Sequence, residues 1–300
     1  MRQSRIYDNN DGILQIGLES PGCVYSKNGH CKMCYYGSGQ KIDAAEAVAT
    51  VKRALENYPN PTGILIGSFG STLDEAEIDR DVLQAALREV AKHKTKDIFI
   101  ETHCNTITTD SLRFLMDNLP QKTISIEMGL ESSNENVLKN VINKNLSLKK
   151  LSDTIELIHS HGMRVVLNVL YGLWYDKQEM QQDFLDTCHW ADSHGADEII
   201  AFLINVKPGT YVEKLFNEGN FVLPSHREFI STLSKLSDQI LCKTYFSWFG
   251  ERQYRGLRLE CIPPDYDGLA PEAVMRFYHD FMEATDITTR RALIKDILSP

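Results

Sequence analysis

The sequence predicts an α/β protein in which six βα units form a partial (β/α)6 barrel with a C-terminal extension. Two observations support this prediction. Short apolar runs typical of buried strands alternate with helix-like stretches six times between residues 12 and 205. In addition, a group of glycine or polar residues follows each of these runs. In a parallel array such groups meet at the carboxyl ends of the strands, where (β/α) barrels carry their functional residues.

The strand-like runs are short and rich in branched apolar residues. Gly12–Leu18 is ended by Ser20–Gly22, and Gly63–Ile66 is a continuous apolar run that suits a strand buried on both faces. The remaining strands are expected at Asp97–Thr102, Thr123–Leu130, Arg164–Leu170 and Glu198–Asn205.

Helix signals separate these strands. Asp43 is a candidate N-cap, and the helix that it begins should end near Asn57, just before two prolines. Further helices are expected at Asp79–Lys92, Asp110–Asn118, Asn134–Val141, Leu148–His161, Lys177–Ser193, Glu272–Thr285 and Thr288–Leu298. The βα pattern stops after about Leu241, so we divide the chain into a core, residues 1–240, and an extension, residues 241–300, that is expected to cover the barrel.

The amino-acid composition argues against several classes of protein. The chain has 300 residues, of which 42% are hydrophobic and 24% charged, and its net charge is −9. The negative charge argues against a generally basic nucleic-acid surface, which needs clustered Lys and Arg. No apolar run approaches the roughly 18 residues that span a bilayer, and the polar start MRQSRIYDNNDG is not a secretory signal. We therefore expect a cytoplasmic protein without membrane contact.

Three of the seven cysteines, Cys23, Cys31 and Cys34, fall within twelve residues in a loop over residues 20–37 that follows the first strand. Thiolates are soft ligands that suit iron–sulfur clusters, zinc or copper(I). A [4Fe–4S] cube held by three thiolates keeps one iron open for another ligand. The spacing therefore favours a cluster with an open iron.

Zinc is the alternative occupant of this loop. Structural zinc takes four ligands, and His30 could be the fourth, but the chain has no second C-x-x-C pair. A disulfide is not indicated, because the cysteine count is odd and the expected compartment is reducing. The other cysteines stand singly, as small buried hydrophobic residues usually do: Cys104, Cys188, Cys242 and Cys261.

Four segments carry a resemblance to a known family: GCVYSKNGHCKMCYYG, GSFGS, GLESSNENVLKNVINKN and INVKPGTYVEKLFNEGNFVLP. They resemble the radical S-adenosylmethionine (SAM) enzymes, in the branch that is related to the elongator catalytic subunit and includes the archaeosine-forming protein. The resemblance covers roughly residues 12–235. Seven residues separate the first two cysteines, instead of the usual three, and this branch shares that spacing.

The resemblance implies the cofactors and their ligands. Cys23, Cys31 and Cys34 would hold a [4Fe–4S] cluster, whose fourth iron would take the amino and carboxylate groups of SAM. Residues 67–69 would offer backbone groups to the SAM amine. Two glutamates would bind the ribose hydroxyls, a lysine the carboxylate and an asparagine the adenosine, while Met33 and a neighbouring tyrosine would pack on the adenine. The cofactor-binding residues so implied are Met33, Tyr35 (or Tyr36), Gly67, Ser68, Phe69, Glu101, Glu131, Lys144 and Asn168.

The reaction that the resemblance implies is reductive cleavage of SAM to a 5′-deoxyadenosyl radical that abstracts hydrogen from a substrate. An external electron donor of the flavodoxin or ferredoxin type would be needed. The acidic chain favours a small-molecule substrate; a nucleoside or tRNA substrate of the archaeosine type stays open, as does a non-catalytic, zinc-stabilised binding protein. The candidate substrate-facing residues each lie just past a strand: His103, Tyr171, Trp174 and Lys207.

The segment Tyr245–Arg258 is aromatic and basic in an otherwise acidic chain. We interpret it as a cover strand with solvated arginines. The alternative is recognition of an anionic or base-containing substrate, since Arg binds phosphate and aromatic rings stack on bases. That alternative would depend on Arg252, Arg255 and Arg258.

Overall fold

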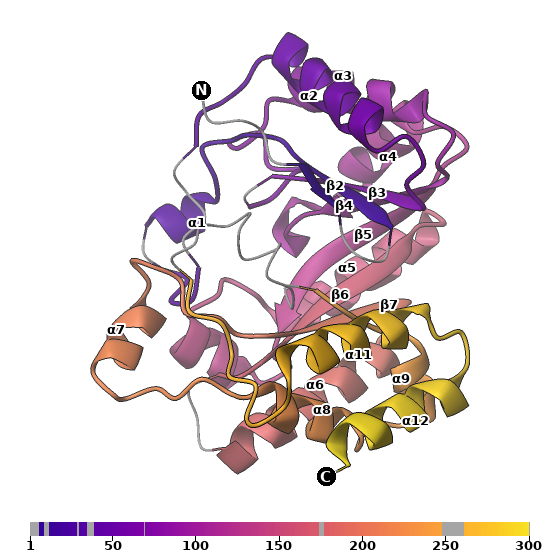
Figure 1. The fold of residues 1–300 in the computed structure, drawn as a ribbon. Coiled ribbons are helices and arrows are strands. Elements are labelled where there is room, and N and C mark those ends of the chain that lie inside the picture. The colour runs from indigo at the N-terminus through magenta and orange to yellow at the C-terminus, as the bar shows by residue number, and fades with distance from the viewer. Residues whose placement is uncertain are drawn as a thin grey trace. The chain divides into compact units, whose positions relative to one another are not determined.

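A computed structural model describes residues 6–8, 12–28, 30–34, 39–68, 70–173, 177–247 and 261–299 of the chain. An eight-stranded sheet organises it, and the strand order β1 to β8 makes each strand the neighbour of the next one in sequence. Figure 1 labels strands β2 to β7. Strand β1 is antiparallel to β2, and the seven strands from β2 onward are parallel. The strands are β1 Ile6–Asp8, β2 Ile13–Gly17, β3 Gly63–Gly67, β4 Asp97–Glu101, β5 Thr123–Glu131, β6 Arg164–Tyr171, β7 Glu198–Leu203 and β8 Thr244–Phe246.

At least one helix lies between each pair of successive parallel strands, as βα crossovers require. The α-helices are α1 Val24–Lys27, α2 Ala44–Asn57, α3 Arg80–Ala91, α4 Thr109–Asn118, α5 Leu148–Ser160, α6 Lys177–Ser193, α7 Tyr211–Asn217, α8 His226–Leu233, α9 Asp238–Cys242, α11 Pro271–Glu283 and α12 Ile287–Leu298. A 3₁₀ turn, η1 Cys104–Thr106, and a π-helix, η2 Val137–Ile142, complete the described elements. Among the described residues, no helix has both the length and the apolar character that a membrane span needs.

The chain divides into two compact units, which we describe separately. Unit 1 consists of Met1–His30, Tyr36–Gly129 and Leu146–Val166, and unit 2 of Cys31–Tyr35, Leu130–Asn145 and Leu167–Pro300.

Unit 1 is built on strands β2 to β5. Ile64 and Ile66 of β3 and Ile98 and Ile100 of β4 are fully buried on one face of the sheet, and Phe99, on the opposite face of β4, is also buried. Helices α2 and α3 pack against each other (Figure 1). The Asp43 side chain accepts the Glu46 N–H at 2.8 Å, which confirms the predicted N-cap of α2.

Unit 2 has an aromatic core. Tyr171 and Phe184 meet edge to face with ring centroids 5.4 Å apart, and Phe229 packs on both rings. Helices α11 and α12 lie side by side, with α11 against β8 and α12 against α8 and α9 (Figure 1). The buried Arg290 of α12 donates to the carbonyls of Leu241 and Thr244, which ties this helix to the start of β8.

The parallel βα order confirms the predicted fold class, and the six predicted strands are present. The structure also differs from the sequence prediction, which did not include β1 or the helices α7, α8 and α9. The cysteine loop contains the single-turn helix α1, a seventh parallel strand, β8, follows the sixth, and the helix expected at Asn134–Val141 includes a π-helix. Strand β8 is only three residues long, too short to give a recognisable alternation of apolar and polar side chains.

Candidate functional site

In unit 1, two predicted cofactor-binding residues lie side by side at the carboxyl ends of neighbouring strands. A Cβ atom added at Gly67 would lie 3.0 Å from Glu101 Oε2, so the carboxylate rests against the bare α-carbon of the glycine. The Gly67 carbonyl accepts the Leu18 N–H at 2.8 Å, which extends the pairing of β2 with β3. Strand pairing thus holds the backbone on which the Glu101 carboxylate rests.

Behind this position lies a carboxylate that the sequence analysis did not identify. Glu77 is 2% exposed, and its Oε2 accepts the Ser71 N–H at 2.9 Å and the Ser68 hydroxyl at 3.2 Å. A Cβ at Gly70 would lie 2.3 Å from that oxygen, so the loop needs glycine there. Burial raises the pKa of Glu77 to about 7, against the effect of its two hydrogen bonds. Glu77 therefore holds the loop that follows β3 from inside.

Hydroxyl groups join the ends of β3 and β4. Ser71 Oγ lies 2.7 Å from Thr102 Oγ1 and 3.1 Å from Thr106 Oγ1, and it accepts the His103 N–H at 3.1 Å. The half-buried His103 ring caps the 3₁₀ turn, because its Nδ1 accepts the Asn105 N–H at 3.1 Å. This local bond orients the imidazole at the carboxyl end of β4.

In unit 2, the segment that carries Cys31 and Cys34 is anchored through the residue after Cys31. The Lys32 N–H donates to Ile142 O at 2.9 Å, its Nζ donates to Asn140 O at 2.8 Å, and its carbonyl accepts the Val212 N–H at 3.3 Å. The π-helix and α7 thus position the cysteine segment. The Cys34 N–H bonds back to Cys31 O at 3.3 Å, so a tight turn joins these two half-buried cysteines.

The end of β5 carries a buried ion pair. Lys144 Nζ lies 2.9 Å from Glu131 Oε1, and the two side chains are 12% and 9% exposed. Glu131 has a φ of +65°, and Asn143, just before the lysine, has a φ of +57°. Both are left-handed conformations that cost a non-glycine residue free energy and often mark functional sites. Glu131 Oε2 is buried and has no hydrogen-bond partner within the described part of the chain.

This ion pair also acts on the cysteines. Burial, with the charges of Cys34 and Glu131, raises the pKa of Cys31 to about 12, while Lys144 lowers it. Cys31, Cys34, Glu131 and Lys144 therefore form one electrostatic group, which we call the β5 group. Thiolate ligands release their protons when a metal centre binds, so this thiol suits a cationic metal centre.

The remaining predicted residues fall into three sets. Cys23 and Met33 are half-buried, with Cys23 immediately before α1, and Ser68 is buried where its N–H donates to Thr72 Oγ1 at 3.0 Å. Asn168 on β6 and Lys207 after β7 are half-buried. The third set lies outside the described residues: Tyr35, Tyr36, Phe69, Trp174, Arg252, Arg255 and Arg258.

Two expectations need correction. Tyr171 is fully buried among Phe184 and Phe229, and its hydroxyl contacts Thr232 Oγ1 at 3.3 Å, so it serves the core and does not face a substrate. The prediction followed from its position at a strand end. The sequence does not show which side of the strand other side chains bury. Cys242 was expected to be buried with the other single cysteines but is exposed, since it ends the short helix α9.

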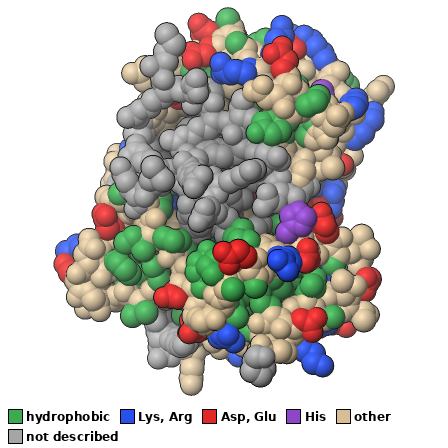
Figure 2. All heavy atoms as spheres, in the orientation of Figure 1, with side chains coloured by type: hydrophobic (Ala, Val, Ile, Leu, Met, Phe, Trp, Pro, Cys, Tyr) green, Lys and Arg blue, Asp and Glu red, His purple; other side chains and the backbone are tan. Residues whose placement is uncertain are grey.

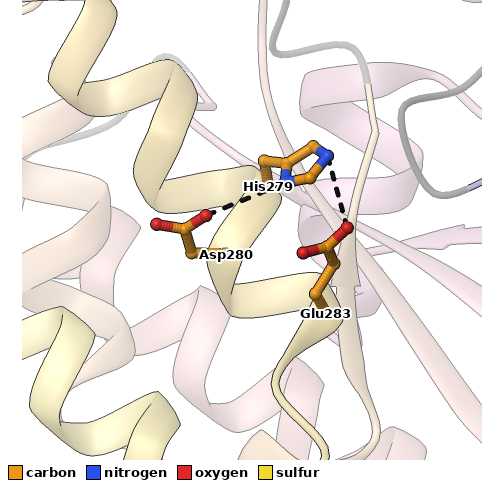
Figure 3. A group of neighbouring side chains, drawn as sticks. All are labelled: His279, Asp280 and Glu283. Carbon is orange, nitrogen blue, oxygen red and sulfur yellow. Dashed lines mark ion pairs between the residues drawn. The ribbon is translucent and has the colours of Figure 1, made fainter.

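A further group of possible metal ligands lies on α11, where His279 faces Asp280 and Glu283 (Figure 3). His279 Nδ1 lies 3.8 Å from Asp280, and its Nε2 lies 3.5 Å from Glu283. The two carboxylates thus approach opposite nitrogens of the imidazole ring. A single metal ion binds only one nitrogen of such a ring. The three side chains are well exposed, and we interpret them as a surface ion-pair network.

Comparison with known proteins identifies the family. Residues 20–191 match the family model of the radical SAM superfamily. The chain belongs to the radical SAM superfamily. Members of this superfamily are enzymes that bind a [4Fe–4S] cluster and SAM. Membership therefore favours a [4Fe–4S] cluster over structural zinc as the group bound by the cysteine loop.

Individual proteins that are similar to this chain in sequence or structure support its membership of the radical SAM superfamily. The chain is 26% identical over 219 residues to archaeosine synthase subunit beta of Methanosarcina acetivorans, a match that covers 70% of this chain and 63% of that protein. The chain thus spans less than two thirds of that relative's length. Among solved structures, an N-terminally shortened Elp3 of Methanocaldococcus infernus has a TM-score of 0.53 at 18% identity, covering 79% of this chain and 56% of that one. SuiB of Streptococcus suis, solved with SAM bound, has a TM-score of 0.57 at 12% identity, covering 82% and 53%. These structural likenesses show the radical SAM barrel fold.

The residues present fit the radical SAM cofactors. Cys31 and Cys34 are soft ligands held by one tight turn. The ribose of SAM offers hydroxyl donors, and Glu131 Oε2 is a buried acceptor that lacks a donor within the described residues. Leaving such an acceptor unsatisfied costs about 1–3 kcal/mol, which a bound donor would recover.

Proposed function

We propose that Cys23, Cys31 and Cys34 hold a [4Fe–4S] cluster whose open iron binds SAM, and that this radical SAM enzyme acts on a small-molecule substrate. When bound and reduced, the cluster and SAM supply a 5′-deoxyadenosyl radical that abstracts hydrogen from a C–H bond. The observation that carries the proposal is the β5 group, in which Cys31 interacts electrostatically with Cys34, with Lys144 and with Glu131, and in which Lys144 and Glu131 form a buried ion pair.

Within the β5 group, Lys144 and Glu131 have separate proposed roles. Lys144 occupies Glu131 Oε1 and so orients the carboxylate, which leaves Oε2 to accept a ribose hydroxyl. An ammonium carries three donors, so Lys144 keeps the capacity to bind the SAM carboxylate as well. Its positive charge also favours the thiolate form of Cys31.

In unit 1, the ends of β3 and β4 carry further candidate residues for SAM contact. We propose that Glu101, held over Gly67, is the second carboxylate that accepts from the ribose. The loop that starts at Ser68 would offer backbone groups to the SAM amine, with Glu77 fixing its conformation. The half-buried His103 and Lys207 remain candidates for substrate contact.

Charge supports a small substrate. The chain carries a net charge of −9, and on the face drawn in Figure 2 the Lys and Arg side chains of the described residues are scattered among Asp and Glu side chains. A long nucleic acid is bound through clustered positive charges that neutralise several phosphates. The dispersed cations therefore favour a substrate without an extended polyanionic chain.

A nucleoside within RNA is the second candidate substrate. The observation that favours it is the similarity to archaeosine synthase subunit beta, since archaeosine is a modified nucleoside. A local basic region in the segment 251–258, which lies outside the described residues, would then contribute to binding.

Anaerobic reconstitution tests the proposal. We expect brown protein with about four irons per chain, as one [4Fe–4S] cluster requires, and 5′-deoxyadenosine when SAM and a strong reductant, or reduced flavodoxin or ferredoxin, are added. Stoichiometric zinc without cluster absorbance would refute it. Assaying 5′-deoxyadenosine formation with a small-metabolite library and, separately, with unmodified tRNA then decides between the substrates. Stimulation by tRNA alone would overturn the small-molecule assignment.

A further inference from the structure

Asn205 has a buried side-chain oxygen that lacks a hydrogen-bond partner among the residues that the structure describes. The residue is 6% exposed and lies two positions after β7, at the carboxyl end of that strand. Its Oδ1 makes no hydrogen bond to any described residue. Buried side-chain oxygens nearly always have a partner in folded proteins, so an exception needs a physical explanation.

The backbone on both sides of Asn205 is firmly held. The Ile204 N–H donates to Tyr171 O at 2.8 Å, which joins the residue to the end of β6. Val206 pairs with Ile262 in both directions, at 3.0 and 2.9 Å. Ile204 and Val206 are also buried, at 3% and 1% exposure. These backbone bonds thus hold Asn205 at the end of the sheet.

Glu131 Oε2, in the same unit, is also a buried acceptor without a described partner. β5 and β7 are separated only by β6 in the sheet, so their carboxyl ends lie about 10 Å apart at the usual strand spacing. A nucleoside with an amino-acid arm is long enough to reach both. Its ribose hydroxyls, adenine amino group and ammonium are the donors that such acceptors lack.

We propose that Asn205 is a cofactor-binding residue whose Oδ1 accepts a hydrogen bond from an N–H or O–H group of SAM. The proposal rests on the proposed function, because it presumes that the carboxyl ends of these strands bind SAM. It adds a residue to the site that the family resemblance did not supply.

The replacement Asn205→Leu separates a binding role from a purely structural one. Leucine has nearly the same shape but no polar atom, so removing an unsatisfied acceptor should leave the melting temperature of the apoprotein unchanged or raise it. The reconstituted holoenzyme should nevertheless bind SAM about fivefold or more weakly, as expected for one lost hydrogen bond. Asn205→Ala should weaken SAM binding similarly, which excludes steric blocking by leucine. SAM affinity is measured by anaerobic equilibrium dialysis.

Asn118 provides a matched control. It is also buried, at 4% exposure, but its Oδ1 accepts from Arg88 Nε at 3.1 Å and its Nδ2 donates to Phe114 O at 2.8 Å. Asn118→Leu should therefore lower the melting temperature and leave SAM affinity unchanged, the opposite of the pattern expected for Asn205→Leu.

Unchanged SAM affinity in both Asn205 variants would overturn the proposal, and so would a lower melting temperature in Asn205→Leu, since that would reveal a partner for Oδ1 within the protein. Failure of the wild-type holoenzyme to bind SAM would instead refute the proposed function itself.

Discussion

Lys144 and Glu131, thirteen residues apart in sequence, form a buried ion pair with a Nζ to Oε1 distance of 2.9 Å. Two left-handed residues, Glu131 itself and Asn143, bring the partners together from the end of β5 and from the end of the π-helix. The Lys144 N–H bonds to Leu138 O at 2.7 Å, which closes the helix end. The pair thus connects the π-helix to the end of β5, where Glu131 Oε2 has no partner among the described residues.

Replacing Lys144 by methionine should destabilise the apoprotein by about 3 kcal/mol, because it leaves a carboxylate buried without its counter-charge. Urea unfolding measures this effect. Lys149→Met is the matched control, since Lys149 pairs with Asp153 at 2.8 Å but both side chains are largely exposed. That change should cost less than about 0.5 kcal/mol. Equal effects of the two substitutions would contradict the role of burial.

Cys31→Ala should prevent assembly of a stable cluster and abolish 5′-deoxyadenosine formation, because two thiolates would remain where the motif supplies three. Iron content and the visible absorbance of the reconstituted protein report the loss. Cys242→Ala, which alters the exposed cysteine of α9, should retain full iron content and SAM cleavage. A Cys31→Ala protein that kept both would show that the cluster is held elsewhere.

Gly67→Ala should weaken SAM binding while the cluster absorbance stays intact. The new Cβ would stand 3.0 Å from Glu101 Oε2 and push the flexible end of that side chain away, at little cost in stability. Gly63→Ala on the same strand gives the contrasting result, because its Cβ would meet the Phe99 ring at 2.9 Å in the interior. It should lower the melting temperature without a specific loss of SAM affinity. The reverse pattern would remove Glu101 from the cofactor site.

Glu77→Gln should change how stability depends on pH. Burial raises the pKa of Glu77 from 4.5 to about 7 in the folded protein, so between these values the unfolded chain ionises while the folded protein keeps the proton. Stability from this group is therefore full below about pH 4.5 and is lost as the pH rises to about 7. At about 1.4 kcal/mol per pKa unit, the loss is on the order of 3 kcal/mol.

The measurement compares the free energy of unfolding of wild type and Glu77→Gln from pH 4.5 to 8. The difference between the two proteins isolates Glu77 from the other shifted groups, since burial also raises the pKa of Asp183 to about 6 and lowers that of His226 to about 4. A constant difference across this range would show that Glu77 does not titrate in the folded protein.

The sequence by itself determined the order of the elements, the strand ends and the cysteine motif. Runs such as Gly63–Ile66 and the N-cap Asp43 are signals carried by neighbouring residues, so they are legible without the fold. Parallel order then follows, because each strand is separated from the next by a helix. From this it was predictable that Glu101 and Glu131 stand at strand ends.

Only the tertiary structure decided which strand-end residues are buried by packing. It also decided which of them have a buried acceptor without a described hydrogen-bond partner. Tyr171 follows the same local pattern as the other candidates, yet rings from α6 and α8 enclose it. Glu77 lies ten residues past the end of β3 in an unremarkable acidic stretch, and its burial depends on how the loop folds back over it. Likewise, the tertiary structure is needed to see that one buried side-chain oxygen of Glu131 and one of Asn205 have no hydrogen-bond partner in the described part of the chain. Burial and hydrogen-bond satisfaction depend on residues far apart in the chain, whereas sequence patterns report only on neighbours.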